Sequence, residues 1–138
     1  GLRTYSMLCP LLPGVADAPE QIDRLIRLAV GHGAEEFFVE PVNGRGPGPG
    51  HTQEALQHHG FPLEAAAIEQ VRGKAGWSEY VLRLLADVQR SVRAHSDISK
   101  LRFLLYPSRL TTAATAAIRH DDAGVVWLGK RQRGAPRP

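Results

Sequence analysis

Two apolar segments decide the fold, Met7-Leu8-Cys9-Pro10-Leu11-Leu12-Pro13-Gly14 and Glu36-Phe37-Phe38-Val39-Glu40-Pro41-Val42-Asn43-Gly44. A single amphipathic helical pattern separates them, and this layout is typical of a βαβ unit. Each apolar run ends abruptly in proline, glycine and polar residues. Because ligands bind at the carboxyl ends of the strands in parallel α/β sheets, the sequence predicts a binding site where these two segments end.

The composition favours one globular domain, which we expect to span residues 1–129. The chain has 138 residues, of which 43% are hydrophobic, and this suffices for one hydrophobic core. No stretch approaches the about 20 apolar residues of a membrane span, and no secretory signal pattern is present, so we expect a cytoplasmic protein without a membrane partner. A single cysteine, Cys9, excludes both an intramolecular disulfide and a multi-thiolate metal site built from this chain alone.

Residues 130–138 form a segment rich in basic residues, glycine and proline. Its four basic residues, Lys130, Arg131, Arg133 and Arg137, produce the formal net charge of +3, because the charges elsewhere nearly balance. Such a composition cannot bury enough apolar surface to fold. We therefore expect a disordered basic tail with, at most, weak affinity for a polyanion such as nucleic acid.

Hydrophobic periodicity predicts alternating strands and helices. We expect buried strands over residues 2–8, ending near Cys9 where Pro10 and Pro13 follow, and over residues 36–39, 101–106 and 124–128. We expect a first helix that Asp17 caps, with Glu20 in capping-box spacing, and that ends at Gly31 and Gly33. Further helices are expected over residues 62–72, 78–94 and 108–119. The predicted fold is thus α/β, with mostly parallel strands and helices.

Each predicted helix has an apolar stripe that should face the sheet. In chain order the stripes are Ile22, Leu25, Ile26 and Ala29; Leu63, Ala67, Ile68 and Val71; Val81, Leu84, Leu85, Val88 and Val92; and Leu110, Ala114, Ala117 and Ile118.

By contrast, most of the residues from Gly44 to Gly50 are glycine or proline, which predicts an irregular loop. This loop could be a lid or binding loop, or a plain connector.

The chain resembles the C-terminal half of radical S-adenosylmethionine proteins of the spore photoproduct lyase-like group. The segment from Cys9 to Asp17 is similar to the end of that group's fifth barrel strand, an apolar strand that leads into Pro-x-x-Pro-Gly-x-x-Asp, and Phe37 to Asn43 is similar to the sixth. Trp77-Ser78-Glu79-Tyr80 and residues 100–107 are similar to the C-terminal extension of some members. The resemblance therefore covers nearly the whole chain.

This resemblance implies the late part of an incomplete (β/α)6 TIM-like barrel plus a C-terminal extension. Such proteins use a 4Fe-4S cluster to cleave S-adenosylmethionine reductively to a 5′-deoxyadenosyl radical, and a Cys-x-x-x-Cys-x-x-Cys loop near the first strand holds the cluster. This chain has no such loop. We therefore expect it to lack the N-terminal half of the barrel, which would be its partner, and to be inactive alone. The substrate is unknown.

The resemblance also implies cofactor contacts for five residues where the two quoted segments end, namely Leu11, Glu40, Pro41, Val42 and Asn43. From chemistry alone, Glu40 and Asn43 can hydrogen-bond ribose hydroxyls or a substrate, whereas Pro41 and Val42 can pack on a purine. Alternatively, Glu40 pairs with a nearby arginine and Asn43 caps a turn.

Arg45, in the glycine-rich loop, is a candidate for binding an anionic substrate or a cofactor carboxylate, because its planar guanidinium can bind two oxygens at once. A solvated loop charge is the alternative.

Several other residues have a structural interpretation as well as a functional one. Cys9 could donate hydrogen to a substrate radical, although a buried core thiol is more common. His51, His58 and His59 could offer metal ligands, but their spacing supplies no convincing third and fourth ligand, and no metal site is predicted. Asp121 and Asp122 are explained by a turn, and Trp77 and Tyr80 by core packing.

A rival interpretation of the whole chain is a free-standing, non-catalytic α/β binding or interaction module that uses the loop from Gly44 to Gly50. The two interpretations predict different surfaces. A half-barrel should expose the edge of its first strand and a patch of apolar surface. A complete module should bury both.

Overall fold

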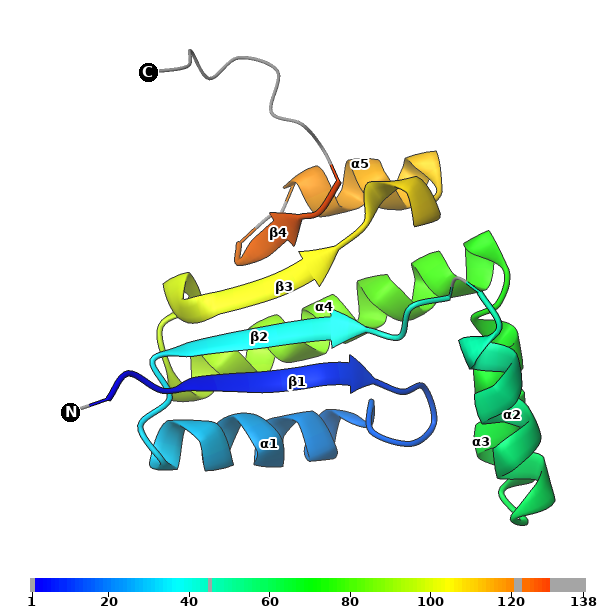
Figure 1. Cartoon of the computed structure of the whole chain (residues 1–138). Helices are drawn as coiled ribbons and strands as arrows, with labels where there is room; N and C mark the ends of the chain where they lie inside the picture. The colour runs from blue at the N-terminus through cyan, green and yellow to red at the C-terminus, as the bar shows by residue number, and fades with distance from the viewer. Residues whose placement is uncertain (1, 45, 121–122, 130–138) are drawn as a thin grey trace.

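The fold contains one four-stranded sheet in which every strand is parallel to its neighbours. A computed structural model describes residues 2–44, 46–120 and 123–129. The strands are β1 (Tyr5–Leu11), β2 (Glu36–Pro41), β3 (Leu101–Leu105) and β4 (Val125–Trp127), and they lie in the order β1-β2-β3-β4 (Figure 1). The predicted α/β class with parallel strands is confirmed.

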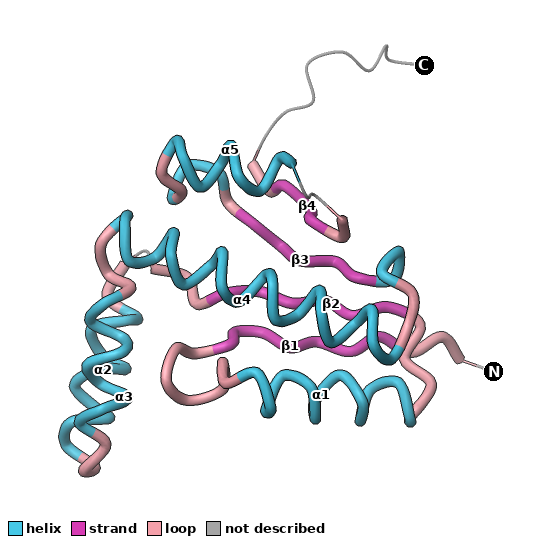
Figure 2. Tube along the Cα trace, turned by 180° about the vertical axis from the view of Figure 1, so that it is seen from behind, coloured by secondary structure: helices cyan, strands magenta, loops and turns pink. Residues whose placement is uncertain are grey.

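Helices cover one face of this sheet. On that face lie α1 (Pro19–Gly31), α4 (Lys74–His95) and α5 (Thr112–His120), as Figure 2 shows from behind. Two helices, α2 (Gly48–His58) and α3 (Pro62–Gln70), pack on each other beside the carboxyl end of the sheet, and short 3-10 turns, Ile98–Lys100 and Pro107–Arg109, flank β3. No helix of the described part of the chain covers the opposite face of the sheet.

The core lies between the sheet and the helices. Because strand side chains alternate between faces, every second residue of β2 and β3 is directed at the helices. Phe37, Val39, Phe103 and Leu105 are all fully buried there. The predicted stripe of α4 is confirmed at all five positions, and Ile22 and Ile26 of α1 are fully buried, with Leu25 and Ala29 partly buried.

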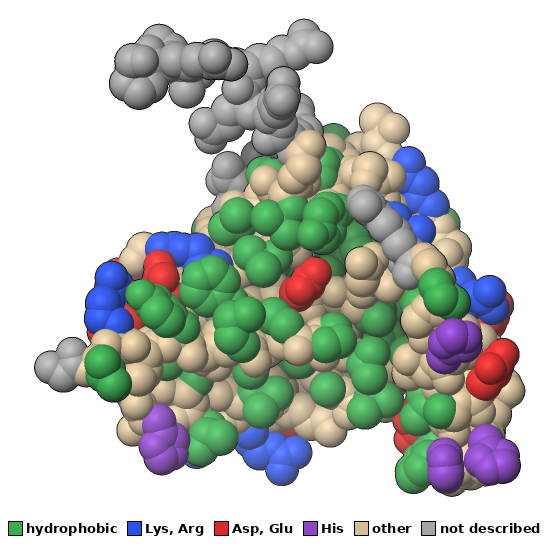
Figure 3. Space-filling view, in the orientation of Figure 1, with side chains coloured by type: hydrophobic (Ala, Val, Ile, Leu, Met, Phe, Trp, Pro, Cys, Tyr) green, Lys and Arg blue, Asp and Glu red, His purple; other side chains and the backbone are tan. Residues whose placement is uncertain are grey.

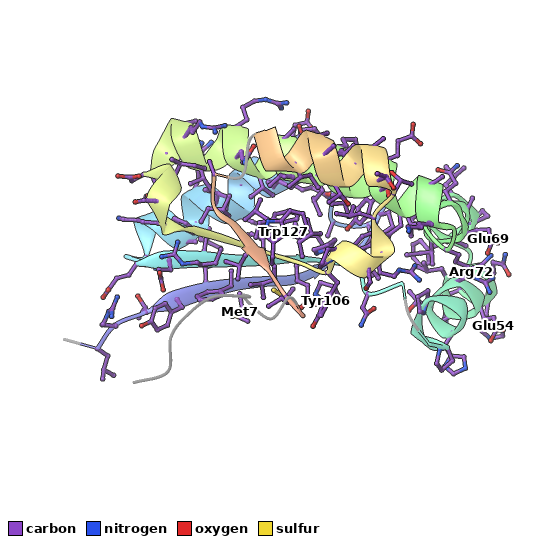
Figure 4. The ribbon with its side chains drawn as sticks, turned by 90° about the horizontal axis from the view of Figure 1, so that it is seen from above. Met7, Glu54, Glu69, Arg72, Tyr106 and Trp127 are labelled. Atoms are coloured by element: carbon purple, nitrogen blue, oxygen red, sulfur yellow. The ribbon has the colours of Figure 1, made fainter. Side chains whose placement is uncertain are left out.

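The uncovered face is largely apolar. The strand register places Met7 beside Phe38, and the alternation along β2 puts Glu36, Phe38 and Glu40 on this same face. Met7 is 65% exposed and Tyr5 is 47% exposed. Figure 3 shows apolar side chains gathered over this side of the sheet, and Figure 4 shows Met7 on the side away from the helices. The expectation that the first strand is buried is therefore wrong.

The end of β1 also differs from the prediction. The strand continues through Pro10 to Leu11, and its register with β2 shifts between Leu8 and Leu11. The peptide bond between Cys9 and Pro10 is cis. Proline is tolerated here because β1 is an edge strand of the described sheet and the residue falls at an irregularity in the pairing.

Two predicted features of the helices are wrong for local reasons. The residue that caps α1 is Ala18, and the Asp17 carboxylate instead accepts hydrogen bonds from the Gly14 amide and Arg83. The predicted irregular loop is shorter than expected, because α2 already begins at Gly48. Pro49 lies in the first helical turn, where its missing N–H costs no hydrogen bond.

Two predicted inward positions are also wrong. Leu63 is 82% exposed, and Ala65 of the same helix is buried instead. Ala117 of α5 is exposed, whereas Leu110, Ala114 and Ile118 are buried as predicted. The helix predicted from residue 108 begins at Thr112, after the 3-10 turn Pro107–Arg109.

Candidate site at the carboxyl edge of the sheet

The start of α4 joins the carboxyl ends of β1 and β2. The Tyr80 hydroxyl donates a hydrogen bond to the carbonyl oxygen of Leu11, the last residue of β1. The Tyr80 hydroxyl oxygen also accepts a hydrogen bond from the amide of Val42, at 3.5 Å. Burial raises the pKa of Tyr80 well above its usual value, so the hydroxyl keeps its proton for this bond.

Two neighbours of Tyr80 extend this network toward the end of β3. Trp77 Nε1 donates to the carbonyl oxygen of Val42 at 2.9 Å, and the ring is buried. The Ser78 hydroxyl accepts from the amide of Thr111 at 2.9 Å, on the segment that follows β3. The interpretation of Trp77 and Tyr80 as core anchors is confirmed, because they fix the backbone of this edge from within.

The five predicted cofactor residues do not share one surface. Adjacent strand residues point to opposite faces, so Glu40 is half-buried on the uncovered face, whereas Pro41 is buried on the helix side. Leu11 and Val42 are buried, at 3% and 7% exposure, and belong to the core. Asn43 is exposed just past β2. Glu40 and Asn43 therefore remain the two predicted cofactor residues whose side chains a ligand could reach.

Cys9 lies close to Glu40 on the same side of the sheet. Its Sγ donates to the carbonyl oxygen of Phe38 at 3.6 Å. Burial raises the pKa of the Cys9 thiol, and the charge of Glu40 raises it further. The thiol is therefore held protonated, which suits hydrogen donation better than nucleophilic attack, and the donor role stays a prediction.

Arg109 is a residue of this edge that the sequence reasoning missed. It lies in the 3-10 turn after β3, and its guanidinium carbon is 5.7 Å from the centre of the Trp77 ring. Its Nε and Nη2 atoms are buried and have no hydrogen-bond partner within the described structure. The only signal in the sequence was its place, three residues beyond the predicted strand at residues 101–106.

A second polar cluster lies on the helix side of the same edge. The Asp17 carboxylate is 7% exposed and accepts from the Gly14 amide at 2.7 Å and from Arg83 at 2.5 Å. A cavity of about 690 Å³ adjoins it, lined also by Gln70 and Glu79. Because Asp17 is already satisfied by its two donors, we assign this cluster to the packing of the β1–α1 loop on α4.

The remaining candidates do not assemble into a site. Within residues 2–44, 46–120 and 123–129, no group of three or more His, Cys, Asp or Glu side chains is placed to hold a metal ion. His58 and His59 contact each other edge to face, with ring centres 5.1 Å apart. Arg45, Asp121, Asp122 and residues 130–138 lie outside the described residues.

Among the described helices, none combines the length and the hydrophobicity that a membrane span requires.

Comparisons with protein-family models, curated proteins and solved structures found no significant match.

Proposed function

We propose that this chain is the C-terminal part of a radical S-adenosylmethionine enzyme of the spore photoproduct lyase-like group. In this proposal it supplies the late βα units of an incomplete (β/α)6 barrel and a C-terminal extension, and it is inactive alone. The observation that carries the proposal is the uncovered, largely apolar face of an all-parallel sheet.

The arrangement of the sheet supports a barrel more than an open sheet. All-parallel sheets are normally covered on both faces, by helices on each side or by closure into a barrel. In a barrel, consecutive strands are neighbours, the helices lie outside, and the inner face lines the centre. In this sheet, consecutive strands are neighbours in the order β1-β2-β3-β4. The helices α1, α4 and α5 lie together on one face, as barrel helices do. Doubly wound sheets instead reverse their strand order and carry helices on both faces.

The edge of the sheet gives a second line of support. Within the described sheet, β1 pairs with β2 alone, so its other edge has unpaired backbone groups. An exposed edge strand with an apolar face is normally paired, covered, or protected from pairing by charged side chains. Tyr5 and Met7 give no such protection, because neither side chain is charged. An upstream βα unit would pair with this edge.

The residues of this chain do not fit an iron-sulfur cluster. Cys9 is the single cysteine, and its thiol is held protonated by burial and by Glu40. A 4Fe-4S cluster requires several thiolates, so in this proposal an upstream segment supplies them. The chain itself would contribute Glu40, on the face that lines the barrel, and Asn43, at the strand end. Both are suited to the hydroxyl groups of a nucleoside.

The test compares this chain with a version extended upstream. Both are subjected to anaerobic iron-sulfur reconstitution, followed by absorbance spectroscopy and an assay for 5′-deoxyadenosine from S-adenosylmethionine. We expect cluster and product only in the extended protein, and neither when the cysteines of its Cys-x-x-x-Cys-x-x-Cys loop are replaced by alanine. Absence of both from the unmodified extended protein would refute the proposal and favour a free-standing binding module.

A further inference from the structure

The buried guanidinium edge of Arg109 is the least satisfied polar group of the described structure. Its Nε and Nη2 atoms are both buried, and no described residue accepts a hydrogen bond from either. Other arginines at or near the sheet have carboxylate partners, such as Arg83 with Asp17 and Arg102 with Glu36, each at 2.5 Å. A buried donor without an acceptor destabilises the folded state, and more so when it is charged.

The two unsatisfied atoms lie on the same edge of the guanidinium. Nε–H and one Nη2–H point in parallel along the side of the arginine fork. That geometry matches two oxygen atoms of one carboxylate or one phosphate group, which accept both bonds at once. The pair of unsatisfied atoms therefore indicates the chemical class of the missing acceptor, an oxoanion.

The surroundings of Arg109 place this edge where ligands bind in parallel sheets. The guanidinium carbon lies over the Trp77 ring, 5.7 Å from its centroid, so a cation–π contact helps to position the guanidinium. Gly44, just after β2, lies against Nη2 so closely that a Cβ on residue 44 would overlap that atom. The guanidinium thus sits between the carboxyl ends of β2 and β3.

We propose that Arg109 is the recognition residue of a binding site for a small oxoanion, a carboxylate or a phosphate, at the carboxyl edge of the sheet. The anion accepts from Nε and Nη2, and Gly44 moves aside from Nη2 to admit it. This site does not depend on the iron-sulfur proposal, because its atoms belong to this chain and its test uses this chain.

The test is a titration of the 138-residue chain with sodium phosphate and, separately, with sodium acetate, at ionic strength held constant with sodium chloride. The first readout is the Nε–Hε NMR signal of Arg109, assigned by its loss in Arg109→Lys. The second is the midpoint of urea unfolding. We expect a saturable shift of the signal and a rising midpoint with at least one of the two anions.

Three variants make the test specific. Arg109→Met keeps the length of the side chain without the charge, so it should unfold at the same or higher urea concentration in chloride and lose the response to anions. Arg109→Lys keeps the charge but not the fork, so it should bind at least about tenfold more weakly. Arg72→Gln, at an exposed arginine paired with Glu69, should respond as the unmodified chain does.

The outcomes separate the possible acceptors. A response to phosphate alone or to acetate alone supports the proposal and names the anion. Equal responses of Arg109→Met and the unmodified chain would overturn it, as would the absence of any saturable response.

Discussion

The Tyr80 hydroxyl of α4 donates a hydrogen bond to the carbonyl oxygen of Leu11, 69 positions earlier in the chain. Since the same hydroxyl accepts from the amide of Val42, one phenol oxygen links the ends of β1 and β2 to α4. The site edge is therefore held by a side chain from within the core. Neighbouring strand ends are fixed relative to each other without help from the glycine-rich loop.

Replacing Tyr80 with phenylalanine tests this link. The ring remains, but the buried groups of Leu11 and Val42 lose their shared partner, so we expect the free energy of unfolding to fall by about 1–3 kcal/mol. Urea unfolding followed by circular dichroism measures it. Tyr5→Phe is the matched control, because it removes the same hydroxyl from a tyrosine that is 47% exposed. Equal losses in the two variants would contradict the assigned role of Tyr80.

The sequence predicted the parts of the fold that depend on local periodicity. The stripe of α4 repeats at helical spacing over Val81, Leu84 and Val88, and all of these residues are buried. By contrast, α2 begins with Gly48-Pro49-Gly50, which are poor helix formers, and it forms in contact with α3. Such tertiary stabilisation leaves no signal in local propensity.

The sequence predicted the position of the candidate site, but not which side chains form it. The carboxyl ends of the first two strands do meet one edge, as parallel pairing requires. The faces of Glu40 and Pro41 depend on strand register, which a short apolar run does not reveal. Arg109 could not be found from the sequence, because its burial depends on Gly44 and Trp77, which are distant in the chain.

A polar contact between α1 and α4 predicts a pH dependence of stability. Asp23 of α1 accepts from His95 Nε2 at 2.7 Å and from the Ser91 hydroxyl at 3.1 Å, both on α4. These hydrogen bonds, with that of His95 the larger effect, hold the pKa of Asp23 below its usual value of 3.8. A carboxyl with a lowered folded-state pKa stabilises the fold above its unfolded pKa, and this stabilisation is lost as pH falls through the folded pKa.

Asp23→Asn should therefore cost stability near about pH 6 and cost progressively less as pH falls toward about 2.5. The melting temperatures of the variant and the unmodified chain, measured side by side over this range, give the difference directly. Gln21→Ala, on the first turn of α1, is the control, and its difference should stay nearly constant with pH because it removes no titratable group. A difference for Asp23→Asn that is the same at both ends of the range would refute the assignment.

The uncovered sheet face predicts self-association of the isolated chain. Met7 is 65% exposed beside Phe38, in a largely apolar surface. Met7→Lys removes apolar area that association would bury, about 1.5 kcal/mol or more, so the dimer dissociation constant should rise by about tenfold. Sedimentation velocity over a range of concentrations measures this change.

The control for that surface lies on a helix. Leu28 of α1 is 58% exposed, and Leu28→Lys changes a similar apolar area away from the uncovered face. It should leave the association unchanged. If Leu28→Lys weakens association as much as Met7→Lys does, or if the chain is monomeric at all concentrations, the uncovered face is not an interface of the isolated chain.

The close approach of Gly44 to Arg109 predicts an energetic coupling between the two residues. A Cβ on residue 44 would overlap Nη2 and crowd the guanidinium carbon, so Gly44→Ala should displace the end of the Arg109 side chain from its rotamer and destabilise the fold by about 0.5–1.5 kcal/mol. In an Arg109→Ala background the obstacle is gone, and the same substitution should cost much less. Urea unfolding of the two single variants and the double variant measures the coupling, which should be at least about 0.5 kcal/mol.

Gly48→Ala is the control for this cycle, because a Cβ on residue 48 meets no atom within 4 Å. Its effect should be the same with and without Arg109. Additive effects of Gly44→Ala and Arg109→Ala would mean that the guanidinium does not occupy the space beside residue 44. Gly44 would then not lie against Nη2. The two unsatisfied nitrogens would no longer be buried, and the oxoanion site would lose the observation on which it rests.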